Sequence, residues 1–71
     1  MTRYLIIIEK TDTGFSAYSP DLPGCVSTGE STAAVEANMH DAVVGHLEEL
    51  REDGTPIPAP NSFAVYVEVA A

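Results

Sequence analysis

The stretch that decides the fold is "YSPDLPGCV", residues 18–26, because it separates two strands of the chain. Pro20 ends the first of these strands, since proline has no N–H to donate to a strand ladder. Pro23 and Gly24 favour a reversal of the chain, and the Asp21 carboxylate can accept hydrogen bonds from amides of the same turn. We therefore expect a strand, a tight loop, and a second strand that begins at the cysteine.

Two apolar side chains of this loop, Leu22 and Cys25, allow more than one role. For Leu22 two roles stay open: it anchors the loop, or it offers an apolar contact to a partner. Cys25 would need a neighbouring base to act as a nucleophile. The two histidines, His40 and His46, both lie in an expected helix, and no spacing places either beside Cys25. We expect Cys25 to be a small buried side chain.

Three short segments around the loop are typical of strands. "RYLIIIEK" (3–10) is rich in β-branched residues and apolar on both faces. "FSAYSP" (15–20) alternates between two faces, and "CVSTG" (25–29) is long enough for one short strand. The connections between them are short, so the sequence predicts an antiparallel meander.

A long amphipathic helix is predicted from about Thr32 to Asp53. Ser31 is a suitable N-cap, since its hydroxyl can accept a hydrogen bond from a first-turn amide, and Gly54 is a suitable C-terminal stop. Val44 lies on the polar side, where it is a candidate partner contact. Gly45, in mid-helix, either lets another chain approach closely or is tolerated at a cost of about 1 kcal/mol. The residues that share one apolar arc are Val35, Met39, Ala42, Val43, His46 and Leu50.

The last part of the chain combines a stiff connector with a strand-like segment. "TPIPAPN" (55–61) has prolines at alternate positions, which favour extended backbone. "SFAVYVEVA" (62–70) alternates, with Phe63 and three valines on one face and Tyr66 on the other. The expected fold is α+β with the order β-β-β-α-β. Its fourth strand lies beside the first and parallel to it, and the helix covers one face of the sheet.

One helix cannot cover both faces of this sheet, although the first strand is apolar on both. Tyr18 and Tyr66 also lie on the face opposite the main apolar rows of their own strands. A contiguous exposed apolar face marks an interaction surface. The sequence therefore predicts a homodimer or a higher homo-oligomer that forms through the uncovered face or edge.

Length and charge narrow the classes of function. The 71 residues form one domain. A domain of this size is only marginally stable as a monomer, and the sequence provides no disulfide or zinc cluster to stabilise it. A net charge of −8 with only three Lys and Arg residues leaves no basic patch for nucleic acid and favours basic protein partners. The run "LIII" (5–8) is too short for a signal peptide or membrane span. A single free cysteine favours the cytoplasm.

The chain resembles the HicB family of antitoxins. The resemblance is carried by the aromatic-containing strand at Phe15, by "PDLPGC", by the Gly-Glu-Ser step at 29–31, and by the alanine-rich helix start "STAAVEAN". It implies a partial ribonuclease H-like fold of order β-β-β-α-β. It also implies a binding protein that neutralises a small basic HicA-type toxin, an mRNA-cleaving ribonuclease, by covering its active site. Charge complementarity between an acidic antitoxin and a basic toxin favours fast association.

Many members of this family carry a C-terminal DNA-binding domain, whereas this chain ends at Ala71, directly after the last expected strand. We therefore expect a single HicB-like domain over residues 1–71 without autonomous operator binding. An alternative function stays open: an orphan homo-oligomeric protein or accessory interaction module without a toxin partner.

Ribonuclease H chemistry needs clustered carboxylates that hold two magnesium ions. The available residues, Glu9, Glu36, Asp41 and Glu68, are not expected to converge, and a fold resemblance does not carry an activity. We expect no enzymatic activity, no metal and no cofactor. The candidate residues for binding a partner are Asp21, Leu22, Val44, Tyr18 and Tyr66.

Overall fold

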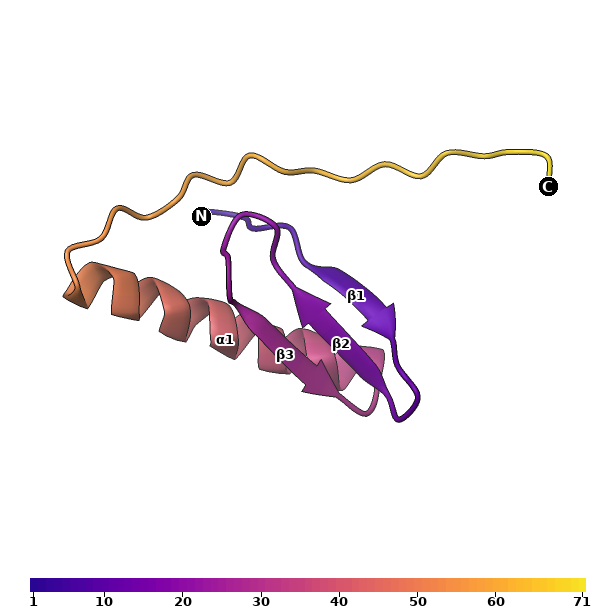
Figure 1. Ribbon diagram of the computed structural model, residues 1–71, viewed down its shortest axis with the longest axis horizontal. Coiled ribbons are helices and arrows are strands. Elements are labelled where there is room, and N and C mark those ends of the chain that lie inside the picture. The colour runs from indigo at the N-terminus through magenta and orange to yellow at the C-terminus, as the bar shows by residue number, and fades with distance from the viewer.

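The computed structural model describes residues 1–71 and shows a three-stranded sheet followed by one helix (Figure 1). The strands are β1 (Ile7–Lys10), β2 (Phe15–Tyr18) and β3 (Val26–Gly29), and the helix is α1 (Thr32–Glu52). Both strand pairs are antiparallel, and the order across the sheet is β1-β2-β3. The predicted α+β class, with a meander followed by a helix on one face of the sheet, is confirmed.

The strand register decides which side chains face the helix. Ala17 is paired with Ile8 across the β1–β2 ladder, and it is buried between the sheet and α1. One position along the strands, Tyr18 is directly opposite both Ile7 and Val26. Because successive side chains of a strand point to opposite faces, these three form a row on the face that α1 does not cover. We call this the open face of the sheet.

The helix begins and ends at the residues that its sequence indicates. The Ser31 hydroxyl accepts a hydrogen bond from the amide of Ala34 at 3.0 Å, as expected of an N-cap. At the other end, Asp53 is the C-cap, and Gly54 has a φ of 69°. This left-handed conformation favours glycine and stops the helix.

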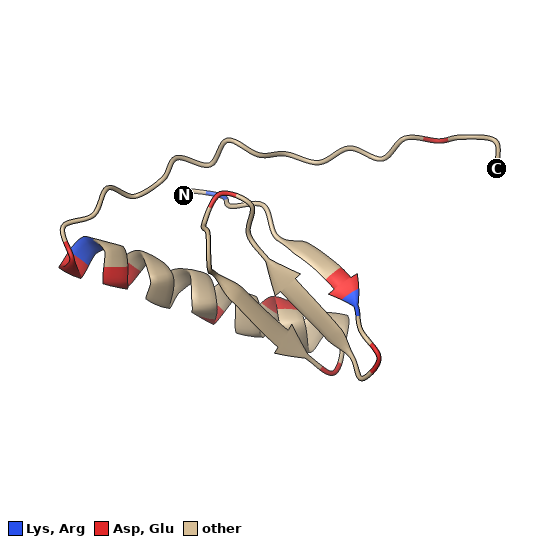
Figure 2. Ribbon diagram, viewed as in Figure 1, with Lys and Arg blue, Asp and Glu red and all other residues tan.

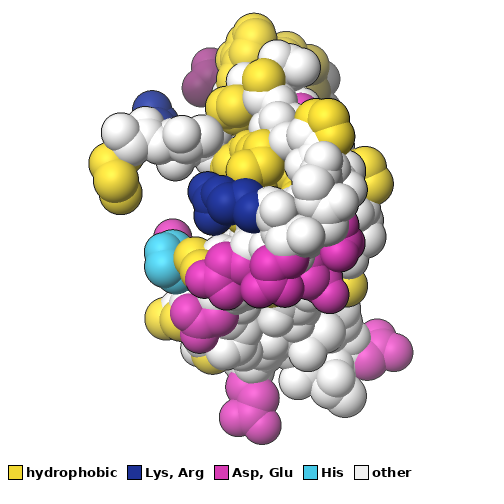
Figure 3. Space-filling model, turned by 90° about the vertical axis from the view of Figure 1, so that its left-hand side faces the viewer, with side chains coloured by type: hydrophobic (Ala, Val, Ile, Leu, Met, Phe, Trp, Pro, Cys, Tyr) yellow, Lys and Arg dark blue, Asp and Glu magenta, His cyan; other side chains and the backbone are white.

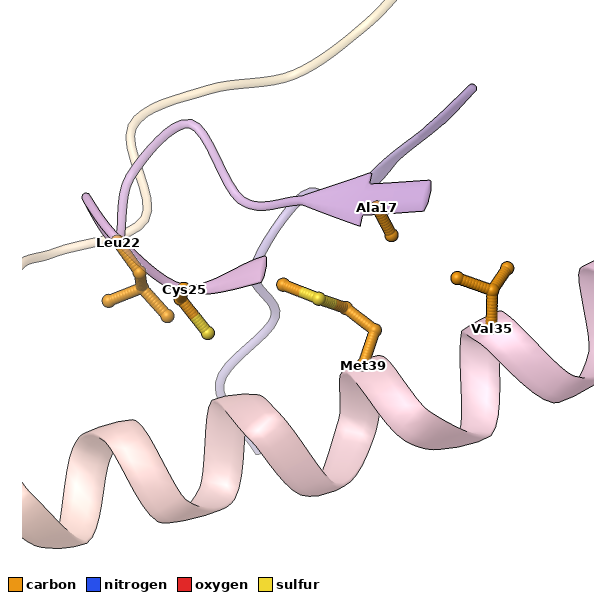
Figure 4. Close-up of a cluster of buried hydrophobic side chains, with 5 residues drawn as sticks. All are labelled: Ala17, Leu22, Cys25, Val35 and Met39. Carbon is orange, nitrogen blue, oxygen red and sulfur yellow. The ribbon is translucent and has the colours of Figure 1, made fainter. Parts of the chain in front are cut away.

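Five buried side chains form the core (Figure 4). Two come from the loop between β2 and β3, one comes from β2, and two come from the first half of α1. Leu22 is 0% exposed. Of the two roles open for this residue, the structure supports the role of an anchor for the loop. The Leu22 side chain is part of the core and presents no surface to a partner. The five residues are Ala17, Leu22, Cys25, Val35 and Met39.

The start of α1 lies directly against the end of β3. A Cβ atom added to Gly29 would lie 2.5 Å from the backbone nitrogen of Val35 and 2.8 Å from its Cα atom. Only a residue without a side chain permits this approach, because both of the nearest atoms belong to backbone that cannot rotate away. Gly29 therefore fixes how closely the helix docks on the sheet.

The predicted fourth strand does not join the sheet within this chain. Residues 56–71 make no backbone–backbone hydrogen bond. They form an extended segment that runs past the sheet and ends well beyond it (Figure 1). We call residues 62–71 the C-terminal arm. The alternation of the arm is that of a strand, but a strand also needs a neighbour, and the connector before the arm does not bring it onto β1.

Candidate protein-binding surface

The open face carries a row of apolar side chains that nothing in the chain covers. Tyr18 is 41% exposed and Val26 is 65% exposed, and Ile7 beside them is half-buried. The sequence predicted Tyr18 as a binding candidate. The other two complete the row, and only the register of the two ladders places them beside Tyr18.

The C-terminal arm is the most exposed apolar part of the molecule. Phe63 is 84% exposed, the three valines of the same face are 75–77% exposed, and Tyr66 is fully exposed. From Phe63 onward the arm makes no hydrogen bond with the rest of the chain. Tyr66, a predicted binding candidate, therefore lies on a segment that is free to contact another chain.

A groove of about 310 Å³ lies between the N-terminal segment and α1. Tyr4 and Ile6 line one wall, and Val43, Val44 and Leu47 line the other. We call this the edge groove, since it runs beside the free edge of the strand that continues into β1. Val44, predicted as a partner contact because it lay on the polar side of the helix, is part of this wall.

Asp21 fixes the start of the arm. Its carboxylate accepts hydrogen bonds from the amides of Asn61 and Ser62 at 3.1 and 3.0 Å, and from the Ser62 hydroxyl at 3.0 Å. The Tyr4 hydroxyl donates a further hydrogen bond to the carbonyl of Pro58. The expectation that Asp21 would bond to amides of its own turn is wrong. Its two carboxylate oxygens instead accept hydrogen bonds from residues about forty positions later in the chain.

Replacing Asp21 with alanine is expected to release the arm while the sheet and helix stay folded. Three hydrogen bonds to one carboxylate are lost, two of them from amides that then rely on water. Amide hydrogen exchange at Asn61 and Ser62 should accelerate at least tenfold, whereas exchange in α1 should change little. Unchanged protection of these two amides would contradict the role given to Asp21.

Acidic side chains gather at the C-terminal end of α1. Glu48, Glu49, Glu52 and Asp53 are exposed there, and Arg51 is the one basic residue among them. Figure 2 shows these charges along the last turns of the helix, and Figure 3, which looks onto this end, shows acidic side chains across it. Negative charge at a helix C-terminus opposes the helix dipole, so this arrangement does not serve the stability of the helix. It does suit a basic partner.

Cys25 and His46 lie on one small cleft of about 440 Å³, together with Glu49. No spacing in the sequence places a histidine near this cysteine, because the loop and the helix meet only in the folded chain. No hydrogen bond joins the two side chains, and burial raises the pKa of the Cys25 thiol above its ordinary value. The thiol therefore stays protonated at neutral pH and has the character of a core side chain, as predicted.

The carboxylates considered for metal-dependent chemistry are not brought together. No group of three or more His, Cys, Asp or Glu side chains lies close enough to hold a metal ion. The helix also lacks an apolar stretch that could cross a bilayer. What the surface does offer is the open face, the arm, the edge groove and the acidic helix end. A small α+β domain with these features is suited to binding other proteins.

Comparison with known proteins identifies the family. The family model described as "HicB_like antitoxin of bacterial toxin-antitoxin system" matches residues 4–70. The chain therefore belongs to the HicB-like antitoxin family.

Individual relatives agree with this assignment. The chain is 34% identical over 64 residues to an uncharacterised 14.9 kDa protein of Haemophilus phage HP1, and 31% identical over 70 residues to Antitoxin HicB 2 of Photorhabdus laumondii. These alignments cover 90% and 97% of the chain, which spans about half the length of both relatives, 48% and 50%. Among solved structures, the chain is similar to one described as "HicA3 and HicB3 toxin-antitoxin complex". The TM-score is 0.74 and the identity 38%, over 84% of this chain and 70% of the other.

Proposed function

We propose that this protein binds and neutralises a small, basic HicA-type ribonuclease toxin that cleaves mRNA, by covering the toxin's active site. One observation carries the proposal. Most of the chain shares its fold, at 38% identity, with a chain from a HicA3–HicB3 complex. The protein then acts by association, as a non-enzymatic antitoxin.

The surface supports a basic partner. The net charge is −8, and four carboxylates gather at the end of α1 although the helix dipole disfavours them there. Opposite charges on two partners speed their encounter and disfavour wrong partners. The apolar row on the open face supplies the second component of a protein interface, a desolvated centre inside a polar rim.

Co-expression tests the proposal. We expect a neighbouring open reading frame for a basic protein of roughly 60 to 80 residues, the scale of a minimal domain. Its product should arrest growth when expressed alone, and this chain should restore growth and co-purify with it. If the chain neither restores growth nor binds that protein, the antitoxin proposal fails. The alternative, an interaction module without a toxin, gains support if no such reading frame adjoins the gene.

A charge reversal tests the part played by the acidic helix end. Glu49→Lys should lower the association rate with the toxin about tenfold at low salt, and the difference should shrink as salt is added. Asp12→Lys is the matched control: it makes the same change in charge in the turn between β1 and β2, and we expect a smaller effect. Because Glu49→Lys improves the charge at the helix C-terminus, slower binding would not reflect unfolding. Equal effects from both variants would remove the acidic helix end from the interface.

A further inference from the structure

We propose that the C-terminal arm of one copy completes the sheet of a second copy. Residues 62–70 would add as a fourth strand along the free edge of β1, and the second copy would return its own arm in the same way. This inference goes beyond toxin binding and concerns how the protein assembles with itself.

The donor is a segment with every property of a strand except a neighbour. It is extended, it alternates between two faces, and its exposed apolar residues all lie outside the core. Its amides and carbonyls from Phe63 onward have no partner in the chain. An exposed strand of this kind is a template for pairing with another chain. The apolar row to be covered is Phe63, Val65, Val67 and Val69.

The recipient is the edge groove. β1 is at the edge of the sheet, with β2 on one side only, so its outer row of N–H and C=O groups is free to pair. Beneath that edge, Val43, Val44 and Leu47 of α1 form an apolar wall opposite Tyr4 and Ile6. A strand added here turns every second side chain toward the wall, which matches the apolar row of the arm.

The other face of the added strand also fits. With the apolar row turned toward α1, Tyr66 points to the opposite side and extends the open face beyond Ile7 and Tyr18. The outer edge of the sheet at β3 offers a poorer place, because Ser27 and Thr28 make up the middle of that strand. The arm is therefore matched to one edge of the sheet and to one orientation of its own faces.

The strand that pairs with the free edge of β1 comes from a second copy, because the arm of the same chain is directed away from that edge. Asp21 holds the amides of Asn61 and Ser62, and three prolines keep the connector before them extended. The arm stands off from the N-terminal segment across a groove of about 880 Å³ instead of pairing with it. Exchange of identical elements about a two-fold axis closes on itself, so it gives a dimer that leaves neither arm unpaired.

Light scattering and isotope-filtered NMR on the full-length protein test this arrangement. At micromolar concentration we expect a mass twice that of the 7.5 kDa chain. In a dimer formed from equal amounts of ¹³C-labelled and unlabelled protein, methyl groups of Val65 and Val67 should show NOEs to Ile6 and Val43 between different chains. A monomer would overturn the proposal, and so would a dimer in which these NOEs occur only within one chain.

Two substitutions in neighbouring positions separate the faces of the arm. Val67→Asp places a charge on the row turned toward α1 and should weaken dimerisation at least a hundredfold. Glu68→Gln changes the opposite face and should leave the dimer intact. Circular dichroism checks that the helix persists in both variants. If Val67→Asp dimerises like the unmodified chain, or if both variants weaken it equally, the arm does not pair in this way.

Discussion

Replacing Leu22 with alanine should lower the free energy of unfolding by about 2 to 5 kcal/mol. Leu22 is 0% exposed and contributes the largest side chain that the loop sends into the core. Its truncation removes apolar contacts and leaves a cavity in the core cluster. Since the free energy of unfolding of a domain of this size is roughly 4 to 10 kcal/mol in total, this one substitution removes a large part of it.

A urea titration followed by circular dichroism measures this effect, with all variants at one protein concentration because the proposed self-association would contribute to apparent stability. Val26→Ala is the matched control: it truncates a branched apolar residue that is 65% exposed, and it should shift stability by no more than about 0.5 kcal/mol. Similar losses for the two variants would contradict the role of Leu22 as the anchor of the loop.

Gly29→Ala should destabilise the protein by about 1 to 3 kcal/mol or more, the scale of overpacking. The added carbon meets backbone atoms of Val35 at 2.5 and 2.8 Å, so the helix start has to move away from β3. Gly45→Ala is the contrasting substitution. Nothing lies within 4 Å of an added carbon there, and alanine in mid-helix should stabilise the protein by about 1 kcal/mol.

If α1 docks on β3 as closely as described, thermal melts should show a lower melting temperature for Gly29→Ala and a higher one for Gly45→Ala. A Gly29→Ala protein that melts at the temperature of the unmodified chain would contradict that close approach. Gly45→Ala also separates the two explanations for a glycine in mid-helix. If the variant is more stable but binds its partner more weakly, then Gly45 serves the partner and is not merely tolerated.

Local sequence signals predicted most of the core domain. The prolines and glycine of "PDLPGC" separate β2 from β3, Ser31 and Gly54 delimit α1, and the apolar arc of the helix contains both of its buried residues, Val35 and Met39. These features depend on interactions within a few residues, which a sequence shows directly. The strands of the structure are shorter than the segments expected, because pairing stops where proline and the loop remove hydrogen-bonding partners.

Features that depend on contacts between distant parts of the chain could not be predicted from the sequence. That Asp21 holds Ser62 depends on the loop and the connector meeting in the folded chain. The edge groove likewise combines Tyr4 with Val44, which no periodicity relates. The fourth strand shows the limit most clearly. Alternation in residues 62–70 predicted a strand, but pairing is a property of two segments, and within one chain the arm finds no neighbour.

The most direct test of the proposed function is inhibition of the purified toxin. The neighbouring basic protein should cleave mRNA, and titration with this chain should stop cleavage at about one binding site per toxin molecule. In a second experiment, the Glu49→Lys variant is added at low salt to toxin that is already cleaving mRNA. Inhibition should then begin more slowly than it does with the unmodified chain. If folded protein in tenfold excess leaves the rate of mRNA cleavage unchanged, this chain does not neutralise that toxin.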